Sequence, residues 1–329
     1  MKELKSDDLI SRVIDIIKKN KDFFIITHDF PDGDSLGSQV ALYTLLKSAG
    51  KNAYMVCDSE IPYQYEFLPS VNQIRKNLQE NAGSSNNSKY ICFCLDSADE
   101  GRFKISIEKI REKAQMIINI DHHPGNAMYG DINIVDPEKS ATAEILYDII
   151  VKGFPELLDY NISLGIYTAI LTDTGRFQYS NTTHSVHRIA SHLLELGVVP
   201  AKVFSCIYEN EPFRRFELLA KVLKRIKLLK SKKLIYSFVL KEDFDKLGLP
   251  FSANDGIIEI LRSASEAKIS AFIKQVEKNN YKVSLRSSDP DSNVAEIALK
   301  FGGGGHKMAS AYSCSGTLKE VLSSLIKAI

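Results

Sequence analysis

The sequence predicts an α/β protein: an N-terminal parallel sheet with flanking helices, a connector helix, and a smaller C-terminal α/β domain. Its 329 residues, of which 44% are hydrophobic and 25% charged, have a globular composition and suffice for two domains. Short apolar runs alternate with stretches of helical periodicity, which is typical of a parallel sheet. This pattern changes near residue 195. We therefore expect domains at 1–195 and 233–329, with a helical linker at 196–232.

In the N-terminal part, the order of elements follows from where the apolar periodicity changes. Apolar runs that predict strands cover 23–26, 53–56, 90–95 and 116–120. Helical spacing covers 9–17, 36–50, 141–150, 162–171 and 186–194. The stretch 81–89 is a surface loop by its composition. In a parallel sheet the loops that leave the carboxyl ends of the strands line the ligand crevice, so polar residues just after these runs are the candidates for function.

In the C-terminal part, a long connector helix is expected over 212–229, followed by a mixed pattern of strands and helices. We expect a strand at 234–240, a helix near 255–262, a hairpin around Asn279-Asn280, then a helix, the run FGGGGH, a strand and a last helix. The basic side of the connector carries Lys221, Lys224, Arg225 and Lys227. Such a face is usually solvated, and tracking of RNA is the alternative.

Charge and cysteine usage exclude several classes of protein. Lys and Arg number 42 against 41 Asp and Glu, so no general field attracts the chain to DNA or to an anionic membrane. The five cysteines form no C-x-x-C pair and suit a reducing compartment. The first residues lack the apolar core of a signal peptide, and no run approaches the roughly 18 apolar residues of a membrane span. We expect a cytoplasmic protein with no membrane partner.

One loop after the first predicted strand gathers a histidine and two carboxylates. His28, Asp32 and Asp34 are spaced as H-x-x-P-D-x-D, and the alternate spacing can turn both carboxylates toward one point. The alternative is structural, because Asp and Gly are common in turns and Asp34 or Ser35 could cap the following helix.

Further acids and histidines follow other elements of the same part. Asp96 ends one apolar run, Asp121-His122-His123 ends the next, and Asp173 follows the helix at 162–171. Carboxylates that share one edge of a sheet repel one another and require cations. Oxygen ligands with a few imidazoles and no thiolate favour Mn²⁺ or Mg²⁺. Two ions about 3.5 to 4 Å apart can activate a water and stabilise both oxygens at phosphorus. The pattern thus indicates metal-assisted phosphoester hydrolysis.

The ordered motifs resemble the DHH phosphoesterase superfamily, whose name-giving motif stands here as Asp121-His122-His123. The runs L-D-S, N-I-V-D-P and T-D-T-G-x-F-x-Y-S-N-T-T resemble the branch of stand-alone nanoRNA and cyclic-dinucleotide phosphodiesterases. The run F-G-G-G-G-H, with S-L-R-S at 284–287, is similar to the DHHA1 domain of that family. The resemblance implies a DHH catalytic domain at 1–195 and a DHHA1 substrate-binding domain at 233–329.

The resemblance also implies a set of metal ligands and catalytic groups. One metal ion would be held by His28, Asp32 and Asp96, and the other by Asp34, Asp96, His122 and Asp173, so that Asp96 bridges. His123 would face the substrate and Asp121 would orient the histidines. The alternative for His123 is a buried, hydrogen-bonded histidine. The implied cofactor is a pair of divalent ions, Mn²⁺ first, with Mg²⁺ or Co²⁺ possible.

The glycine run implies a nucleotide clamp in the second domain. Glycine lets a backbone come close to a ligand, and its amides can bind phosphate. By resemblance, Arg286 and His306 would contact phosphate while Gly303, Gly304 and Gly305 approach the nucleotide. Alone, the run could equally be a flexible turn.

The activity implied by the resemblance is hydrolysis of short oligonucleotides (nanoRNA, pApA) and/or cyclic di-AMP to 5'-nucleotides. The alternatives are a phosphatase of 3'-phosphoadenosine 5'-phosphate, an inorganic pyrophosphatase, or a non-catalytic nucleotide-binding regulator. The sequence does not rank the nucleotide substrates, because selectivity depends on pocket shape. Relatives suggest a homodimer through the first domain. Arg176 and Tyr179 follow Asp173 and could touch the substrate or only pack.

Overall fold

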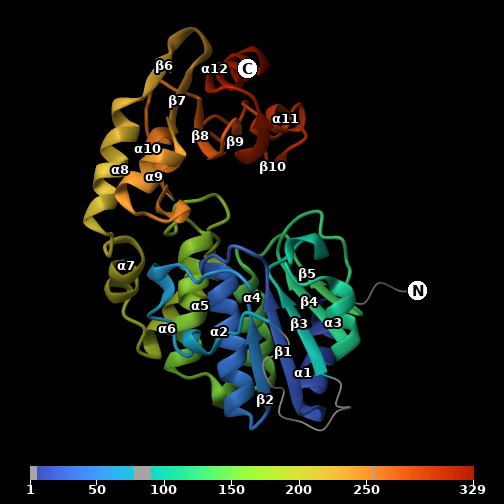
Figure 1. The fold of residues 1–329 in the computed structure, drawn as a ribbon. Helices are drawn as coiled ribbons and strands as arrows, with labels where there is room; N and C mark the ends of the chain where they lie inside the picture. Colours follow the sequence, from blue (N-terminus) through green and yellow to red (C-terminus); the bar gives the residue numbers. More distant parts are fainter. Residues whose placement is uncertain (1–5, 78–89, 255) are drawn as a thin grey trace. The chain divides into compact units, whose positions relative to one another are not determined.

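The computed structural model describes residues 6–77, 90–254 and 256–329. The loop expected at 81–89 lies outside the described residues. By its internal contacts the chain divides into two compact units, Met1–Asn210 and Glu211–Ile329 (Figure 1). This boundary divides the predicted linker, 196–232, between the two units.

The N-terminal unit is built on a five-stranded sheet in the order β2-β1-β3-β4-β5, and all its strands are parallel. The strands are β1 (Asp22–Thr27), β2 (Asn52–Val56), β3 (Tyr90–Leu95), β4 (Ala114–Asp121) and β5 (Ile132–Val135). The first four confirm the predicted strands, since strands buried on both faces have continuous apolar sequences. The prediction lacked β5, a four-residue edge strand in which Asn133 interrupts the apolar run.

Helices cover both faces of this sheet (Figure 1). They are α1 (Ser6–Lys19), α2 (Gly33–Ser48), α3 (Ile107–Lys113), α4 (Thr142–Gly153), α5 (Tyr160–Asp173), α6 (His184–Glu195) and α7 (Pro200–Tyr208). One sheet face, with Ile25 and Phe93, shares the larger core with α1, α2, α4 and α5. The other face, with Phe24 and Cys92, packs against α3. The predicted helices are confirmed, whereas α7 falls in the stretch that was expected to be linker.

The strand order fixes where a ligand is expected to bind. The chain passes from β1 to β2 on one side and then to β3 on the other side of β1. In doubly wound sheets such a reversal opens a crevice at the carboxyl ends of the two strands, and ligands bind there. The loops after β1 and β3 begin at His28 and Asp96, so the fold places both residues at this point.

A close helix contact brings two further loops to the same edge. A Cβ at Gly37 of α2 would lie 2.4 Å from the carbonyl oxygen of Gly165 in α5, and one at Gly33 would lie 2.3 Å from Thr172 Oγ1. The two helices therefore approach through glycine and align the start of α2 with the end of α5. This contact brings the elements that carry Asp34 and Asp173 together.

The C-terminal unit contains a six-stranded mixed sheet in the order β10-β11-β9-β8-β7-β6. Its strands are β6 (Lys227–Leu229), β7 (Leu234–Val239), β8 (Ile269–Glu277), β9 (Asn280–Ser287), β10 (Gly304–His306) and β11 (Ala309–Ser315). Its helices are α8 (Phe213–Lys224), α9 (Lys241–Leu247), α10 (Ile257–Arg262), α11 (Val294–Leu299) and α12 (Leu318–Ala328). One sheet face packs on α11 and α12, and the other packs on α8, α9 and α10. The predicted hairpin is confirmed as β8 and β9.

The connector helix predicted over 212–229 is wrong at its end. The helix α8 stops at Lys224, and Lys227–Leu229 form the edge strand β6 on β7. Ile226 and Leu228 both pack against the core between α8 and the sheet. Their spacing of two residues fits a strand, but Ile226 also continues the helical spacing of α8. The apolar pattern at these residues therefore did not distinguish a helix from a strand.

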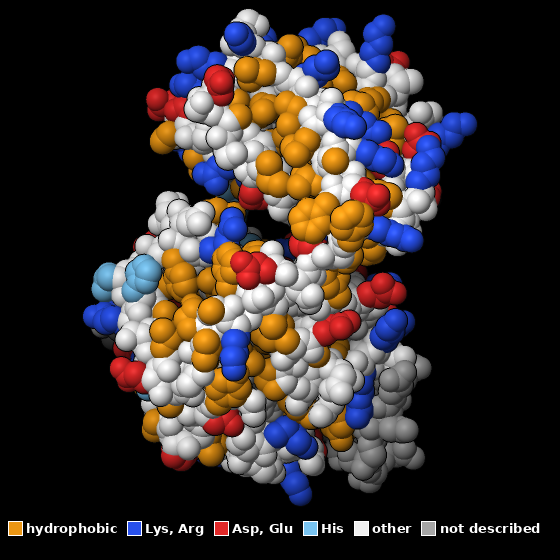
Figure 2. Space-filling model, turned by 90° about the vertical axis from the view of Figure 1, so that its left-hand side faces the viewer, with side chains coloured by type: hydrophobic (Ala, Val, Ile, Leu, Met, Phe, Trp, Pro, Cys, Tyr) orange, Lys and Arg blue, Asp and Glu red, His pale blue; other side chains and the backbone are white. Residues whose placement is uncertain are grey.

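The basic face of the connector is partly used inside the protein. Arg225 binds Asp243 through both terminal nitrogens, at 2.5 and 3.0 Å, and Lys221 Nζ lies 3.6 Å from the same carboxylate. The remaining lysines, Lys224 and Lys227, are exposed. On the face of the molecule in Figure 2, Lys and Arg side chains lie around apolar ones.

Across the described ranges, no single helix is long and apolar enough to cross a membrane. Only α6 and α7 together pass that test of length and composition, and they are bent by 107° at the break between them.

Candidate metal centre and nucleotide site

Asp32 and Asp34, which follow β1, both accept hydrogen bonds from the first amides of a helix. Asp32 caps α2, where its Oδ1 accepts a hydrogen bond from the Ser35 amide at 3.0 Å. Asp34 accepts hydrogen bonds from the first amides of α4, those of Thr142 at 2.7 Å and Ala143 at 3.1 Å. The cap of α2 that was expected from Asp34 or Ser35 is thus provided by Asp32, and Asp34 binds the start of α4 instead. These hydrogen bonds leave lone pairs of both carboxylates available for a cation, because a carboxylate offers about four acceptor sites.

His28 has a ring orientation that suits a metal ligand. Its Nδ1 lies 2.8 Å from the carbonyl oxygen of Asp29, which can only accept, so Nδ1 carries the proton. The unprotonated Nε2 then points to Asp96 Oδ2 at 3.5 Å and to Asp32 Oδ1 at 3.9 Å. A second hydrogen bond that fixes the tautomer is typical of metal-binding histidines.

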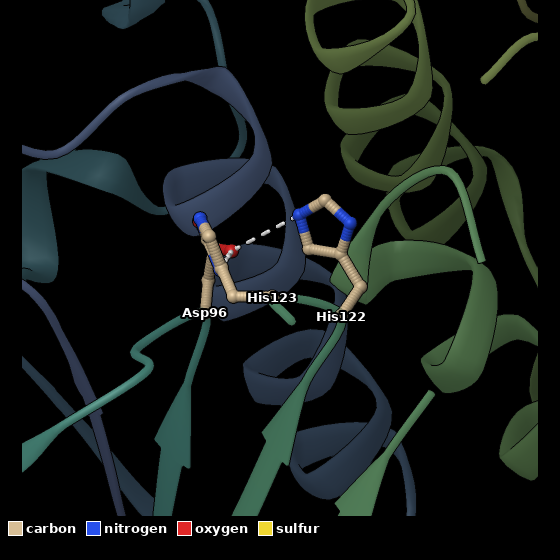
Figure 3. A group of neighbouring side chains, drawn as sticks. All are labelled: Asp96, His122 and His123. Carbon is tan, nitrogen blue, oxygen red and sulfur yellow. Dashed lines mark ion pairs between the residues drawn. The ribbon is translucent and has the colours of Figure 1, made fainter. Parts of the chain in front are cut away.

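Asp96 lies beside His122 and His123 (Figure 3) and also belongs to the group of His28 and Asp32. It is 2% exposed and has a positive φ of 58°, a backbone conformation that non-glycine residues adopt only when their surroundings impose it. Its Oδ1 lies 3.7 Å from His122 Nε2 and 3.6 Å from His123 Nδ1, and Thr142 Oγ1 donates a hydrogen bond to it at 3.2 Å. Its Oδ1 thus faces His122 and His123, whereas its Oδ2 faces His28.

His122 follows β4 and faces two further carboxylates. Its Nε2 lies 3.4 Å from Asp173 Oδ2 and 3.7 Å from Asp34 Oδ2. Its Nδ1 lies 3.3 Å from the carbonyl oxygen of Lys139, which again directs the unprotonated nitrogen toward the acids. In Figure 3 the rings of His122 and His123 rise from adjacent positions beyond the end of β4.

The donor atoms form three compact groups. Within each group all ligand atoms lie within 4.8 Å of one another, and the groups are His28, Asp32 and Asp96; Asp34, His122 and Asp173; and Asp96, His122 and His123. The first two groups have the composition of two metal sites, and Asp96 lies between them. The structure brings together every residue for which the sequence suggested a ligand role.

The charges of the cluster show why cations suit it. Burial raises the pKa of Asp34 well above its ordinary value, and the negative charge of Asp96 raises it further. Burial and Asp96 likewise raise the pKa of Asp173. Carboxylates that destabilise each other's ionised forms in this way are stabilised by a divalent ion, and the oxygen and imidazole donors fit Mn²⁺ or Mg²⁺. The residues present thus fit a pair of divalent ions.

His123 has a different environment from His122. Its Nδ1 donates to Asp121 Oδ1 at 2.8 Å, and Asp121 is completely buried. Burial lowers the pKa of His123, but the hydrogen bond to Asp121 and the charge of Asp96 outweigh it and raise the pKa to about 9. The proton on Nδ1 is therefore held by Asp121, and Nε2 is left to interact with other groups.

Sequence reasoning missed the residues that hold Asp121 in place. Asn126 donates to Asp121 Oδ2 at 2.6 Å and to the Ser97 carbonyl at 3.1 Å, while its own Oδ1 accepts from Asn119 at 2.9 Å. Asn119 lies inside β4 and is fully buried. A polar residue in an otherwise apolar strand was the signal that could have identified this network.

In the C-terminal unit, pairing places Arg286 and His306 on one sheet face. Ala309 of β11 pairs antiparallel with Arg286 of β9 on one side and with His306 of β10 on the other. Directly paired residues share a face, so the two side chains lie roughly 10 Å apart across the small Ala309. Arg286 also contacts Glu259 of α10, with its Nε 3.2 Å from Oε1.

The glycines of the run FGGGGH differ in how much space surrounds them. A Cβ at Gly303 would lie 2.3 Å from the Ala311 carbonyl, and one at Gly305 would lie 2.6 Å from the Ala309 carbonyl. Gly304, in contrast, faces open space and is exposed. Packing against β11 therefore explains Gly303 and Gly305, whereas the backbone is open to a ligand at Gly304 and also at Gly302, which has a positive φ of 71°.

Arg176 and Tyr179 pack within the N-terminal unit. The Arg176 guanidinium lies 5.1 Å from the centre of the Tyr208 ring, and the Tyr179 ring covers Gly175. Three residues in succession, from Gly175 to Phe177, have positive φ angles. Neither side chain belongs to the three groups of potential metal ligands.

Comparison with known families agrees with this architecture. Residues 22–172 match the N-terminal domain of the DHH family, and residues 231–329 match the DHHA1 domain. The chain belongs to the DHH family and carries a DHHA1 domain. It is an enzyme of the phosphoesterase class, as the resemblance predicted.

Two relatives and one solved structure extend over most of the chain. A protein of Thermus thermophilus, named bifunctional oligoribonuclease and PAP phosphatase NrnA, is 34% identical over 295 residues, which are 89% of this chain and 84% of its own. The protein of that name from Bacillus subtilis is 27% identical over 290 residues, 87% of each chain. The crystal structure of an exopolyphosphatase-related protein from Bacteroides fragilis superposes with a TM-score of 0.90 at 25% identity and covers 100% of this chain and 97% of that one.

Proposed function

We propose that this enzyme uses two divalent metal ions to hydrolyse phosphoester bonds at the 3'-oxygen of short nucleotides. The observation that carries the proposal is the position of Asp96, whose Oδ2 lies 3.5 Å from His28 Nε2 and whose Oδ1 lies 3.7 Å from His122 Nε2. One carboxylate shared between two groups of ligands suits two metal ions that lie close together. When bound, such a pair activates a water and stabilises the oxygens at phosphorus.

In this proposal each metal ion has its own set of ligands. His28, Asp32 and Asp96 hold the first ion, and Asp34, Asp96, His122 and Asp173 hold the second. The support is the tautomer of both imidazoles, because Nδ1 of His28 and of His122 faces a carbonyl oxygen and Nε2 faces carboxylates. Mn²⁺ is the proposed ion, since the donors are oxygen and imidazole without thiolate.

His123 acts on the substrate, with Asp121 as its positioning residue. The hydrogen bond between Nδ1 and Asp121 keeps a proton on that nitrogen and leaves Nε2 to bind a phosphoryl oxygen or to protonate the leaving 3'-oxygen. Asn126 and Asn119 hold Asp121 in place and complete a line of hydrogen bonds that starts inside β4.

The C-terminal unit binds the nucleotide in this proposal. Arg286 and His306 share one sheet face and present a guanidinium and an imidazole to a phosphate, while the open backbone at Gly304 allows close approach. Gly303 and Gly305 keep that backbone on β11.

The proposed substrates are short RNA oligonucleotides and 3'-phosphoadenosine 5'-phosphate (pAp). Relatives that cover most of the chain are named oligoribonuclease and PAP phosphatase, which supports both substrates. Cyclic di-AMP is the alternative within the same chemistry. A non-catalytic regulator is disfavoured, because the whole set of ligands is present.

A substrate comparison with Mn²⁺ tests this function. The enzyme is given pApA, a five-nucleotide RNA, pAp, cyclic di-AMP and pyrophosphate separately, and kcat/KM is measured for each. We expect turnover of the linear oligonucleotides and of pAp, with adenosine 5'-monophosphate from pApA and pAp. A preference for cyclic di-AMP would make it a cyclic-dinucleotide hydrolase, and turnover of pyrophosphate alone would contradict the proposal.

Two further features belong to the proposal. The cytoplasm is the proposed compartment, supported by five cysteines that are all free in the structure. A homodimer through the N-terminal unit is supported by the family resemblance. Light scattering that gives the mass of one chain would contradict the dimer.

A further inference from the structure

Phe30 lies midway between His28 and Asp32, two proposed ligands of the first metal ion. Two residues of chain span at most about 7 Å, so the Cα atom of Phe30 lies within that distance of the Cα atom of each ligand. The strand β1 ends at Thr27, and its loop borders the crevice at the carboxyl ends of β1 and β3. The chain itself therefore fixes Phe30 beside the metal centre.

The Phe30 ring has no place in a hydrophobic core. Among the large hydrophobic residues that the structure describes, Phe30 is the most exposed, at 86%. From His28 to Asp34 the only other exposed residue is Asp32, whereas Pro31 between the two is buried. The Asp32 carboxylate lies 3.9 Å from His28 Nε2, so the first group of ligands is open to solvent two residues from Phe30. An aromatic ring thus stands at the opening of the metal centre.

The backbone at Phe30 is held in an unusual conformation. Its φ angle of 54° is left-handed, although a residue before proline ordinarily prefers an extended backbone. The Phe30 amide donates a hydrogen bond to Ser59 Oγ at 3.0 Å, and Ser59 Oγ donates to Asp29 Oδ1 at 3.3 Å. The Asp29 amide donates to the carbonyl oxygen of Arg102 at 2.9 Å. Glycine or asparagine fits such a turn better, so neither the turn nor core packing explains a phenylalanine here.

Met128 has the same combination of features on the other side of β3. It is 55% exposed, its φ is 54°, and its amide donates to Asn126 Oδ1 at 2.7 Å in the loop after β4. Among the described residues, only Phe30 and Met128 are large hydrophobic residues that are at least half exposed and have a positive φ. Both lie in loops that carry histidines of the site. Backbone outliers of this kind cluster where a ligand binds.

We propose that Phe30 stacks on a nucleobase of the substrate, beside the phosphate that is hydrolysed. This inference rests on the proposed function and deepens it, because it assigns a contact to the base, whereas the contacts proposed above concern the phosphate. Every nucleobase has a π-face, so stacking on an aromatic ring tolerates any base, as the hydrolysis of short RNA of varied sequence requires.

A fluorescence titration tests the contact directly, because the chain contains no tryptophan. Phe30→Trp keeps an aromatic face and introduces a single indole, whose emission is quenched when a base stacks on it. With Ca²⁺ in place of Mn²⁺, pApA should quench this emission, and pyrophosphate, which has no base, should not. Tyr160→Trp is the matched control, since Tyr160 is 46% exposed and begins α5, about 20 Å from Asp173 at the other end of that helix. Its emission should not respond to pApA.

The rates give a second test. Phe30→Ala should lower kcat/KM for pApA about 5- to 150-fold, the equivalent of about 1–3 kcal/mol for stacking of one base, and Phe30→Tyr should stay near the wild type. Two analogues of pApA, each with one adenine replaced by hydrogen, locate the stacked base. With one of them, the wild type and Phe30→Ala should have equal kcat/KM. Melting temperatures equal to that of the wild type would show that the variants fold.

An unquenched Phe30→Trp, or a loss in Phe30→Ala that persists with both analogues, would overturn the stacking role. Quenching by pApA without hydrolysis by the wild type would support stacking and refute the proposed function instead. Hydrolysis of pApA at equal rates by the wild type and Phe30→Ala would overturn stacking alone. If Phe30→Ala also had a lower mass by light scattering, Phe30 would be a contact between two copies of the chain.

Discussion

Replacing Asp96 by Asn should abolish metal-dependent hydrolysis while the fold persists. The amide has nearly the same shape as the carboxylate and can still accept the hydrogen bond from Thr142 Oγ1. It loses the negative charge that faces His28 at 3.5 Å and His122 at 3.7 Å, and with it the shared ligand of both proposed ions. Each proposed divalent ion loses one carboxylate ligand, which should cost at least the roughly 4 kcal/mol of opposite unit charges about 4 Å apart at an effective dielectric constant of about 20, and that energy corresponds to about a thousandfold in rate. We therefore expect kcat/KM for pApA to fall at least that far.

The assay measures release of adenosine 5'-monophosphate from pApA over a range of Mn²⁺ concentrations. Asp58→Asn is the matched control, because Asp58 also follows a strand of the same sheet, β2, but belongs to none of the three groups of ligands and pairs with Lys104. The control should keep the wild-type rate. An Asp96→Asn variant with a rate within tenfold of the wild type would refute the bridging role. Activity restored by high Mn²⁺ would show weakened binding of metal rather than loss of the shared ligand.

Two further predictions concern the contacts that support the two units. Gly37→Ala should lower the free energy of unfolding in urea by about 1–2 kcal/mol and reduce activity, because overpacking against Gly165 outweighs the gain in helix propensity. Ser48→Ala, on the exposed side of the same helix, should change neither stability nor activity. Unchanged stability and activity of Gly37→Ala would show that the helices can separate freely. Burial raises the pKa of Asp243, but the hydrogen bond from Arg225 outweighs it and holds that pKa below its ordinary value. Asp243→Asn should therefore lower the free energy of unfolding by about 2 kcal/mol at pH 7. The difference from the wild type should shrink as the pH falls below the ordinary pKa of an aspartate, because a carboxylate with a lowered pKa stabilises the fold only above that pH. A difference that does not change with pH in denaturant titrations would contradict this reasoning.

The sequence predicted the strands and the ends of the strands well, for a physical reason. Strands buried on both faces, such as β3, have continuous apolar sequences, and the first polar residue after such a run marks the edge of the sheet. Asp96 and His28 were found in this way. Short or partly polar elements such as β5 and α9 lack this contrast, and residues 227–229 fit a strand and a helix about equally well.

Apart from Asn119, whose polar side chain in an apolar strand is a signal, the supporting residues of the site could not be predicted from the sequence, because their roles depend on how separate loops meet. Asp34 caps α4, which begins more than a hundred residues later, and Thr142 donates a hydrogen bond to Asp96, 46 residues earlier in the chain. Asn126 obtains its role only when the loop after β4 folds back on Asp121 and meets the Ser97 carbonyl of the loop after β3. The spacing of motifs in the sequence identifies candidate metal ligands and catalytic side chains, but it does not identify the residues that hold them in place.

The central claim is that two metal ions share Asp96. A crystal of the Mn²⁺-loaded protein, measured at the manganese absorption edge, tests it most directly. We expect two anomalous peaks on either side of the Asp96 carboxylate, one beside His28 and Asp32 and the other beside His122 and Asp173. A single peak, or two peaks that do not share Asp96, would contradict the claim.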